Sequence, residues 1–184
     1  MTKRRIFIAI NLPDNLKKKL FDWQAKWPDL DYRLIRWTKK DNLHITLSFI
    51  GYVTDDETYE ICNFVKKVAK KHEPFFVNLE KIILGPPDKN PRMFWVQGEK
   101  SQKLADIQSD LRDAIDQRTG VRYNAFRPHI TLAKFKPGFM KTFPKDFQED
   151  FKAQIPVETI EVMESALHRT GAEYTILESV ELGE

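Results

Sequence analysis

The tetrapeptide HITL occurs twice in the sequence, at residues 44–47 and again at residues 129–132. His129 lies 85 residues after His44, which is close to half of the 184-residue chain. Both copies lie in apolar runs that are rich in β-branched residues and bounded by turn-forming residues, so both are predicted to be strands. The sequence therefore predicts two related halves that contribute one such strand each.

Alternation along the first strand predicts which of its side chains lie together. One face is expected to carry the polar residues His44, Thr46 and Ser48. The opposite face is expected to carry the apolar residues Leu43, Ile45, Leu47 and Phe49.

The second strand has the same pattern. His129 and Thr131 are expected on one face, with Ile130 and Leu132 on the other. Each strand would then bury its aliphatic pair and present an imidazole and a hydroxyl, about 6 to 7 Å apart along the strand.

Composition describes an ordinary globular chain, with 41% hydrophobic and 31% charged residues. This length suits one domain or two small joined lobes. The formal net charge of +3 is too small to argue nucleic-acid binding by itself, so the function must come from a local site. The single cysteine, Cys62, excludes an intramolecular disulfide and a multi-cysteine zinc site, and we expect it to be a small buried residue.

The beginning of the sequence places basic residues before an apolar run at Ile6–Ile10. That run is too short for the hydrophobic region of a signal peptide, and no segment approaches transmembrane length. We therefore expect a cytoplasmic protein that does not contact a membrane, and a monomer.

The remaining segments alternate between strand and helix patterns. A first helix, opened by Pro13 and ended by Pro28, has an apolar stripe with three lysines, Lys17 to Lys19, largely off it on a solvated face. Two more helices are expected, from Asp55 with a capping box at Thr54 and Glu57, and from a cap at Ser101 to Thr119-Gly120. Besides the HITL strands, strands are expected at 5–11, 34–38, 75–84, 92–97, 158–167 and 174–182.

The predicted order is β-α-β-β-α-β-β-α-β-β-β, with residues 34–38 forming a hairpin with the first HITL strand and residues 136–151 irregular or weakly helical. Strands that mostly follow strands favour the α+β class over a doubly wound parallel sheet. We expect one bilobal domain over residues 1–184, with two pseudo-symmetric antiparallel sheets, helices on their outer faces and a central cleft.

Two imidazoles and two hydroxyls across a cleft suggest acid-base chemistry. The ordinary pKa of histidine, about 6.5, lets one ring act as a general base while the other acts as a general acid. Displacement at phosphorus needs both, because the nucleophile loses a proton while the leaving oxygen gains one. The threonine hydroxyls would bond the non-bridging oxygens, and a metal would be redundant.

A single His-x-Thr strand would ordinarily be a polar face only. Its repetition at the same offset favours a site, since the chain has only four histidines. The other two are weaker candidates: His72 is expected in the last turn of a helix, and His168 in a hairpin loop, lining the cleft or solvated. The residues alone leave open which HITL histidine is the acid and which is the base.

Three blocks together resemble the two-histidine phosphoesterases, and among them the bacterial and archaeal RNA 2′,3′-cyclic phosphodiesterases once called 2′-5′ RNA ligases. The blocks are RRIFIAINLP at 4–13, RWTKKDNLHITLSFIG at 36–51 and FRPHITLA at 126–133. The resemblance implies a bilobal fold and hydrolysis of a terminal ribose 2′,3′-cyclic phosphate to a 2′-phosphate, without metal or cofactor. It also implies that His44 is the proton donor to the 3′-oxygen, that His129 is the proton acceptor, and that Thr46 and Thr131 hold the phosphate.

One residue departs from the family pattern. Members often carry arginine after the second motif, whereas this chain has Lys134, which keeps the charge but loses the bidentate fork. Strand parity is expected to turn Lys134 away from His129. Arg127 is a candidate for phosphate binding, with a surface salt bridge as the alternative.

Four aromatic residues are candidates for stacking on a nucleobase, with core packing as the alternative role of each. They are Phe7, Tyr123, Phe126 and Tyr174. The expected partner is RNA or a nucleotide that ends in a 2′,3′-cyclic phosphate. Two alternatives share these residues: 2′-5′ RNA ligation by the same two histidines, and a nucleotide-binding or RNA-binding module with little turnover.

Overall fold

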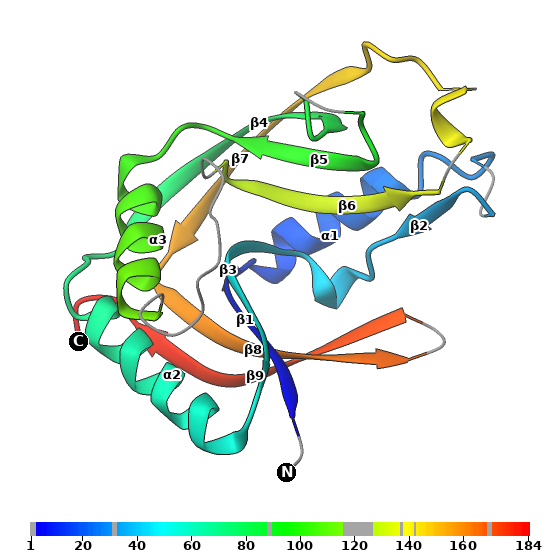
Figure 1. Cartoon of the computed structure of the whole chain (residues 1–184). Helices are drawn as coiled ribbons and strands as arrows, with labels where there is room; N and C mark the ends of the chain where they lie inside the picture. Colours follow the sequence, from blue (N-terminus) through cyan, green and yellow to red (C-terminus); the bar gives the residue numbers. More distant parts are fainter. Residues whose placement is uncertain are drawn as a thin grey trace.

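A computed structural model describes residues 3–30, 33–87, 90–115, 127–136, 138–141, 143–168 and 171–184. Within these ranges the chain is a mixed α+β fold in which strands pair antiparallel and helices pack beside them (Figure 1). The helices are α1 (Asp14–Gln24), α2 (Asp55–Ala69) and α3 (Gln102–Ile115), with short 3-10 turns η1 (Lys40–Asn42) and η2 (Phe139–Lys141). The strands are β1 (Arg4–Asn11), β2 (Ile35–Trp37), β3 (His44–Val53), β4 (Phe75–Gly85), β5 (Met93–Gly98), β6 (His129–Phe135), β7 (Gln148–Val157), β8 (Thr159–His168) and β9 (Gly171–Glu181).

The strands form one strongly curled sheet in the order β7-β4-β5-β6-β3-β1-β8-β9, with β2 added on β6. The expected antiparallel α+β class is confirmed. The two expected sheets are the two halves of this continuous sheet, and they diverge in Figure 1 on either side of β3 and β6. These two strands are the HITL strands, and they are joined at a single registered pair, Ile45 with Ile130.

A β-bulge in β3 changes the predicted parity. Against β1, Thr46 pairs with Ala9 and Ser48 pairs with Ile8, so Leu47 is an extra residue. Because of this extra residue, Ser48 is buried and Phe49 is 64% exposed. The predicted faces of Ser48 and Phe49 were therefore wrong, since alternation fails where two residues oppose one.

The second HITL strand contains the same irregularity. Against β5, Thr131 pairs with Trp95 and Ala133 pairs with Phe94, so Leu132 is the extra residue. Ala133 is buried and Lys134 is exposed as a result. The bulge returns Lys134 to the face of His129, which corrects the prediction that it points away.

Two other expectations were wrong. Residues 34–38 do not form a hairpin with the first HITL strand: β2 pairs with β6, and the Thr38 amide donates to the Leu132 carbonyl at 2.8 Å. The turn η1 instead leads the chain from this pairing into β3. The segment expected to be irregular contains the start of β7, which pairs with β4 as an edge strand. Its side chains alternate only between exposed and half-buried at Gln148–Gln154, so it lacks the apolar pattern of a core strand.

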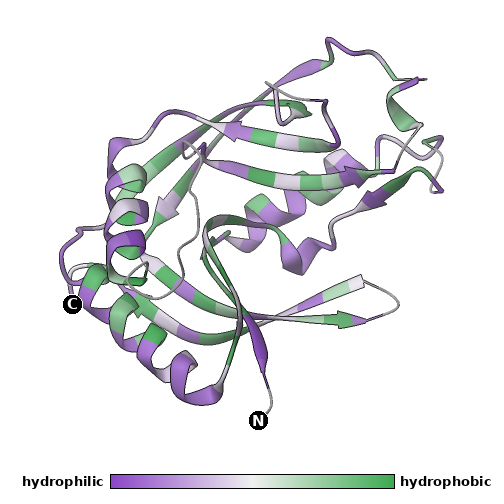
Figure 2. Cartoon of the chain, in the orientation of Figure 1, coloured by the Kyte–Doolittle hydropathy of each residue, from purple (hydrophilic) through white to green (hydrophobic). Residues whose placement is uncertain are grey.

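The core lies between the convex side of the sheet and the helices. Ile6, Ile8 and Ile10 of β1 are almost completely buried there, and Cys62 of α2 is buried among them as the sequence predicts. Figure 2 shows green and purple residues alternating along strands and helices, as expected for elements with one buried face. The end of the third predicted helix, Thr119-Gly120, lies outside the described residues.

The lysine run of α1 is only partly solvated. Lys18 and Lys19 are exposed, but Lys17 is only 6% exposed. Its Nζ donates to the Asp41 carbonyl of η1 at 3.4 Å. The prediction of a uniformly solvated lysine face was therefore wrong at Lys17, because α1 packs against η1 on that side.

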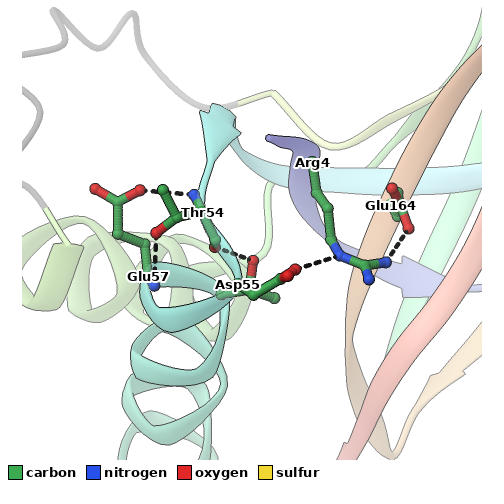
Figure 3. A network of polar contacts seen from close by, with 6 residues as sticks. Arg4, Thr54, Asp55, Glu57 and Glu164 are labelled. Carbon is green, nitrogen blue, oxygen red and sulfur yellow. Dashed lines mark hydrogen bonds and ion pairs between the residues drawn. The ribbon is translucent and has the colours of Figure 1, made fainter. Parts of the chain in front are cut away.

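The beginning of α2 is fixed by the predicted capping box (Figure 3). The Thr54 hydroxyl accepts from the Glu57 amide at 3.3 Å, and the Glu57 carboxylate accepts from the Thr54 amide at 2.7 Å. Arg4 then joins α2 to β1 and β8 through Asp55 at 2.7 Å and Glu164 at 2.8 Å. None of the described helices is long and apolar enough to cross a membrane.

Candidate active site

The two HITL motifs lie side by side on adjacent strands. Continuing the antiparallel register outward from Ile45 and Ile130 sets His44 opposite Thr131 and Thr46 opposite His129. Both isoleucines are fully buried, so the polar residues share the opposite, concave face of the sheet. In a regular antiparallel ladder such diagonal neighbours lie about 7 to 8 Å apart, which leaves room for a phosphate between the two imidazoles.

His44 is held by hydrogen bonds on both ring nitrogens. Nδ1 lies 2.7 Å from the Asn42 carbonyl oxygen, and Nε2 lies 2.9 Å from the Thr46 hydroxyl. A carbonyl can only accept, so Nδ1 donates, and in the neutral ring Nε2 accepts from Thr46. Nε2 is therefore the atom that can exchange a proton.

His129 is oriented in the same manner. Its Nδ1 donates to the Arg127 carbonyl at 2.8 Å, again two residues earlier in the chain. This leaves Nε2 as the proton-exchanging nitrogen of the second ring as well. Both histidines are thus oriented by the same local hydrogen bond.

Burial lowers the pKa of His44 to about 4. The hydrogen bond to Asn42 opposes this shift, and positive charge at His129, Lys17 and Lys134 adds to it. Burial also lowers the pKa of His129, with the hydrogen bond to Arg127 opposing. Both rings are consequently neutral at pH 7 in the free protein, and an anion bound between them would favour their protonated forms.

A groove of about 340 Å³ adjoins His44. Phe7 and Tyr174 form its inner wall, with ring centroids 5.0 and 5.4 Å from the His44 ring. Its described lining contains several cations and no carboxylate. The basic residues are Arg5, Arg36, Lys39, Lys134 and His168.

The other predicted site residues fall as follows. Thr46 and Thr131 are half-buried beside the histidines, and Arg127 is exposed, with its carbonyl holding His129. Of the stacking candidates, Phe7 and Tyr174 line the groove, whereas Tyr123 and Phe126 lie outside the described residues.

The two remaining histidines are separate from the pair. His72, just after α2, has its Nε2 3.1 Å from Asp110 of α3, so it contacts α3 and not the HITL strands. His168 lines the far part of the groove, with Nε2 3.4 Å from Glu173.

Two residues of the site were missed by sequence reasoning. Lys17 was grouped with its exposed neighbours, and Trp95 was treated only as part of a strand. Trp95 stacks on the His129 ring at a centroid distance of 3.8 Å. Neither position has a local sequence signal, since both act through segments distant in the chain. Within the described ranges, no group of three or more His, Cys, Asp or Glu side chains is arranged to hold a metal ion.

Known proteins resemble this chain in sequence and in fold. Residues 10–95 match the family model LigT like Phosphoesterase. The RNA 2′,3′-cyclic phosphodiesterase of Thermus thermophilus is 28% identical over 185 residues, which cover 97% of this chain and 90% of that protein. The RNA 2′,3′-cyclic phosphodiesterase of Methanocaldococcus jannaschii is 25% identical over 177 residues, which cover 94% and 98%.

The chain is similar in sequence to the LigT-like phosphoesterases. The resemblance drawn from the motifs is thereby confirmed. Its LigT-like fold matches the crystal structure of TT0787 from Thermus thermophilus, with a TM-score of 0.84 and 26% identity over 97% of this chain and 98% of that one. Escherichia coli LigT complexed with 3′-AMP has the same fold, with a TM-score of 0.74 and 23% identity over the whole of both chains.

Proposed function

We propose that this chain, as one bilobal two-histidine domain over residues 1–184, hydrolyses a terminal ribose 2′,3′-cyclic phosphate to a 2′-phosphate. The observation that carries the proposal is the placement of two His-x-Thr pairs on one face of adjacent strands, with each histidine held through Nδ1 by the carbonyl two residues earlier. The name RNA 2′,3′-cyclic phosphodiesterase, borne by relatives that align with most of the chain, supports the same activity.

In the proposed reaction a water molecule attacks phosphorus and the P–O3′ bond breaks. His129 Nε2 takes the proton from the water, and His44 Nε2 gives a proton to the departing 3′-oxygen. The ring that donates ends neutral and the ring that accepts ends protonated, so proton exchange with solvent restores the starting state.

The neighbouring groups have roles in charge and orientation. The Thr46 and Thr131 hydroxyls would donate to the non-bridging oxygens as negative charge builds on them. Thr46 now bonds His44, so it would exchange this partner for the phosphate. His44 must carry a proton to act as the donor, and the bound phosphate anion would raise its low pKa toward neutrality.

The groove supports RNA or a nucleotide as the substrate. Phe7 and Tyr174 lie against His44, where the nucleoside attached to the phosphate would sit. The described lining of the groove contains basic side chains and no carboxylate, which suits the phosphates of a preceding nucleotide. We assign Arg127 a secondary role in phosphate binding, and the cytoplasmic, monomeric state expected from the sequence stays a prediction.

The direct test is incubation with an RNA oligonucleotide that ends in a 2′,3′-cyclic phosphate, in the presence of EDTA. A 2′-phosphate product supports the hydrolase, a 2′-5′ linked product with a 5′-hydroxyl RNA supports ligation, and tight binding without product supports the binding module. We expect His44→Ala and His129→Ala each to lower turnover by about 10²-fold or more. A near-normal rate in either variant would remove that histidine from the mechanism.

A further inference from the structure

The indole of Trp95 lies flat against the imidazole of His129. The two ring centroids are 3.8 Å apart with an interplanar angle of 25°, so the contact is a face-to-face stack. Register explains it: Gln97 pairs with His129 and Trp95 pairs with Thr131, so Trp95 lies diagonally beside His129 on the same face. The stack therefore belongs to the catalytic side of the sheet.

The indole is also fixed from behind. At Gly85 of β4, an added Cβ would lie 2.2 Å from Trp95 Cδ2 and 2.6 Å from Cγ. Only a residue without a side chain lets the ring occupy this position. Trp95 is 8% exposed, and its Nε1 is buried without a hydrogen-bond partner in the described part of the chain. Packing between Gly85 and His129, and not a polar contact, holds the ring in place.

His44 has no equivalent partner among the described residues. Phe7 is tilted by 40° to it and Tyr174 meets it edge-on at 77°, with centroids 5.0 and 5.4 Å away. The negative face of an aromatic ring attracts a cation, most strongly for tryptophan, whereas an edge does not. The two histidines of otherwise equivalent motifs thus differ in how well the neighbouring aromatic rings can stabilise the protonated imidazole.

We propose that Trp95 is a positioning residue that fixes the plane of the His129 ring and stabilises its protonated form through the indole face. The proposal rests on the proposed function, in which His129 receives the proton from water. Burial lowers the pKa of His129, which weakens it as a base, and the stacked indole opposes that effect.

Other charges around His129 are arranged on the neighbouring elements. They are His44 on β3, Arg127 and Lys134 next to and on β6, and Arg36 on β2, opposite Lys134. All are basic, so none of them favours a proton on His129. The residues of β5 that face the site, Met93, Trp95 and Gln97, are uncharged, so the indole is the group on β5 that can favour the imidazolium.

The test compares Trp95→Leu with Trp95→Phe, by NMR titration of the four histidines in the full chain. Leucine keeps apolar bulk without a ring face, and phenylalanine keeps the face. We expect Trp95→Leu to lower the pKa of His129 by about half a unit or more and Trp95→Phe to retain most of the native value. His72, which contacts Asp110 of α3, is the internal control. An unchanged His129 titration in Trp95→Leu would overturn the proposal.

Incorporation of fluorinated tryptophan provides a test that preserves packing if Trp95→Leu does not fold. Fluorine withdraws charge from the ring face at nearly constant shape, so the pKa of His129 should fall as fluorination increases. A pKa that does not change would overturn the electrostatic role. These titrations need no turnover, so they remain informative if the cyclic-phosphate assay fails. If that assay succeeds, Trp95→Leu should lower kcat more than it changes KM, and Trp95→Phe should rescue it.

Discussion

At the scale of single residues, one short motif produces two chemically different histidines. Each ring is held by a carbonyl two residues earlier, at 2.7 Å for His44 and 2.8 Å for His129. Their surroundings then diverge: burial, reinforced by cations at Lys17 and Lys134, lowers the pKa of His44, while an indole covers His129. In the proposed mechanism, the acid-base roles of the two histidines therefore depend on what packs around each motif.

The pH dependence of kcat/KM should be a bell centred on the acidic side of neutrality. This profile reports the free enzyme, in which the pKa of His44 is about 4 and that of His129 lies below 6.5. One ring must be protonated and the other neutral, so the rate peaks between the two values and falls on either side. The check is kcat/KM from about pH 3.5 to 8.5, and a profile that is flat or still rising above about pH 7.5 would contradict these shifts.

Replacing Lys17 with methionine should raise the pKa of His44, since it removes a buried positive charge that disfavours the imidazolium. It should also raise the melting temperature. Lys17 is 6% exposed and forms no ion pair with a described residue, and burial of an unpaired cation is costly. Methionine keeps the aliphatic stem in place.

The matched control is Lys18→Met, one position along the same helix. Lys18 is exposed and pairs with Asp22 at the surface, so its loss should leave the titration of His44 unchanged. Equal effects of the two substitutions would show a general change in charge and not a role for Lys17.

The repeated residues of the site could be predicted from the sequence. The residues that contact the site from segments distant in the chain could not. His44 and His129 occupy the same position in two identical tetrapeptides, so strand alternation alone predicted that each histidine shares a face with its threonine. Lys17 differs from Lys18 only in what packs against it. Trp95 meets His129 through the pairing of β5 with β6, and no local pattern encodes that pairing.

At the scale of elements, paired β-bulges shape the site. Each HITL strand has an extra residue three positions after its histidine, Leu47 in β3 and Leu132 in β6. The bulges return Phe49 and Lys134, each five residues after its histidine, to the concave face. Periodicity could not predict this, because a bulge changes the count of residues without changing their types. For a similar reason β7 was missed, since an edge strand needs no continuous apolar face.

The capping box of α2 gives a stability prediction at this scale. Thr54→Ala removes the hydroxyl that accepts from the Glu57 amide, and it should cost about 1 kcal/mol of the free energy of unfolding. In a chain of this size that corresponds to a fall of about 2 to 4 °C in melting temperature. Thr54→Ser, which keeps the acceptor, should stay near the native value, and turnover should be unaffected in both variants.

At the scale of the whole molecule, the site lies where the two halves of the sheet meet. β3 belongs with β1, β8 and β9, and β6 belongs with β5, β4 and β7. Each half supplies one imidazole and one threonine, so a ligand between them contacts both halves. Apolar residues from both halves share one core cluster, which holds the halves together behind the site.

Inorganic phosphate should therefore stabilise the whole chain. A ligand at about 100 times its Kd adds about 2.7 kcal/mol to the free energy of unfolding, or about 5 to 10 °C in melting temperature. The effect should be lost in the double variant His44→Ala, His129→Ala, with chloride at equal ionic strength as the salt control. A rise of the same size in the double variant would mean that phosphate binds elsewhere.

Within the described part of the chain, one registered pair, Ile45 with Ile130, joins the two HITL strands. The distance between the two imidazole rings consequently depends on the packing of the apolar core beneath them. Replacing either isoleucine with alanine would remove apolar packing beneath this pair. We expect slower catalysis at temperatures where the protein is still fully folded.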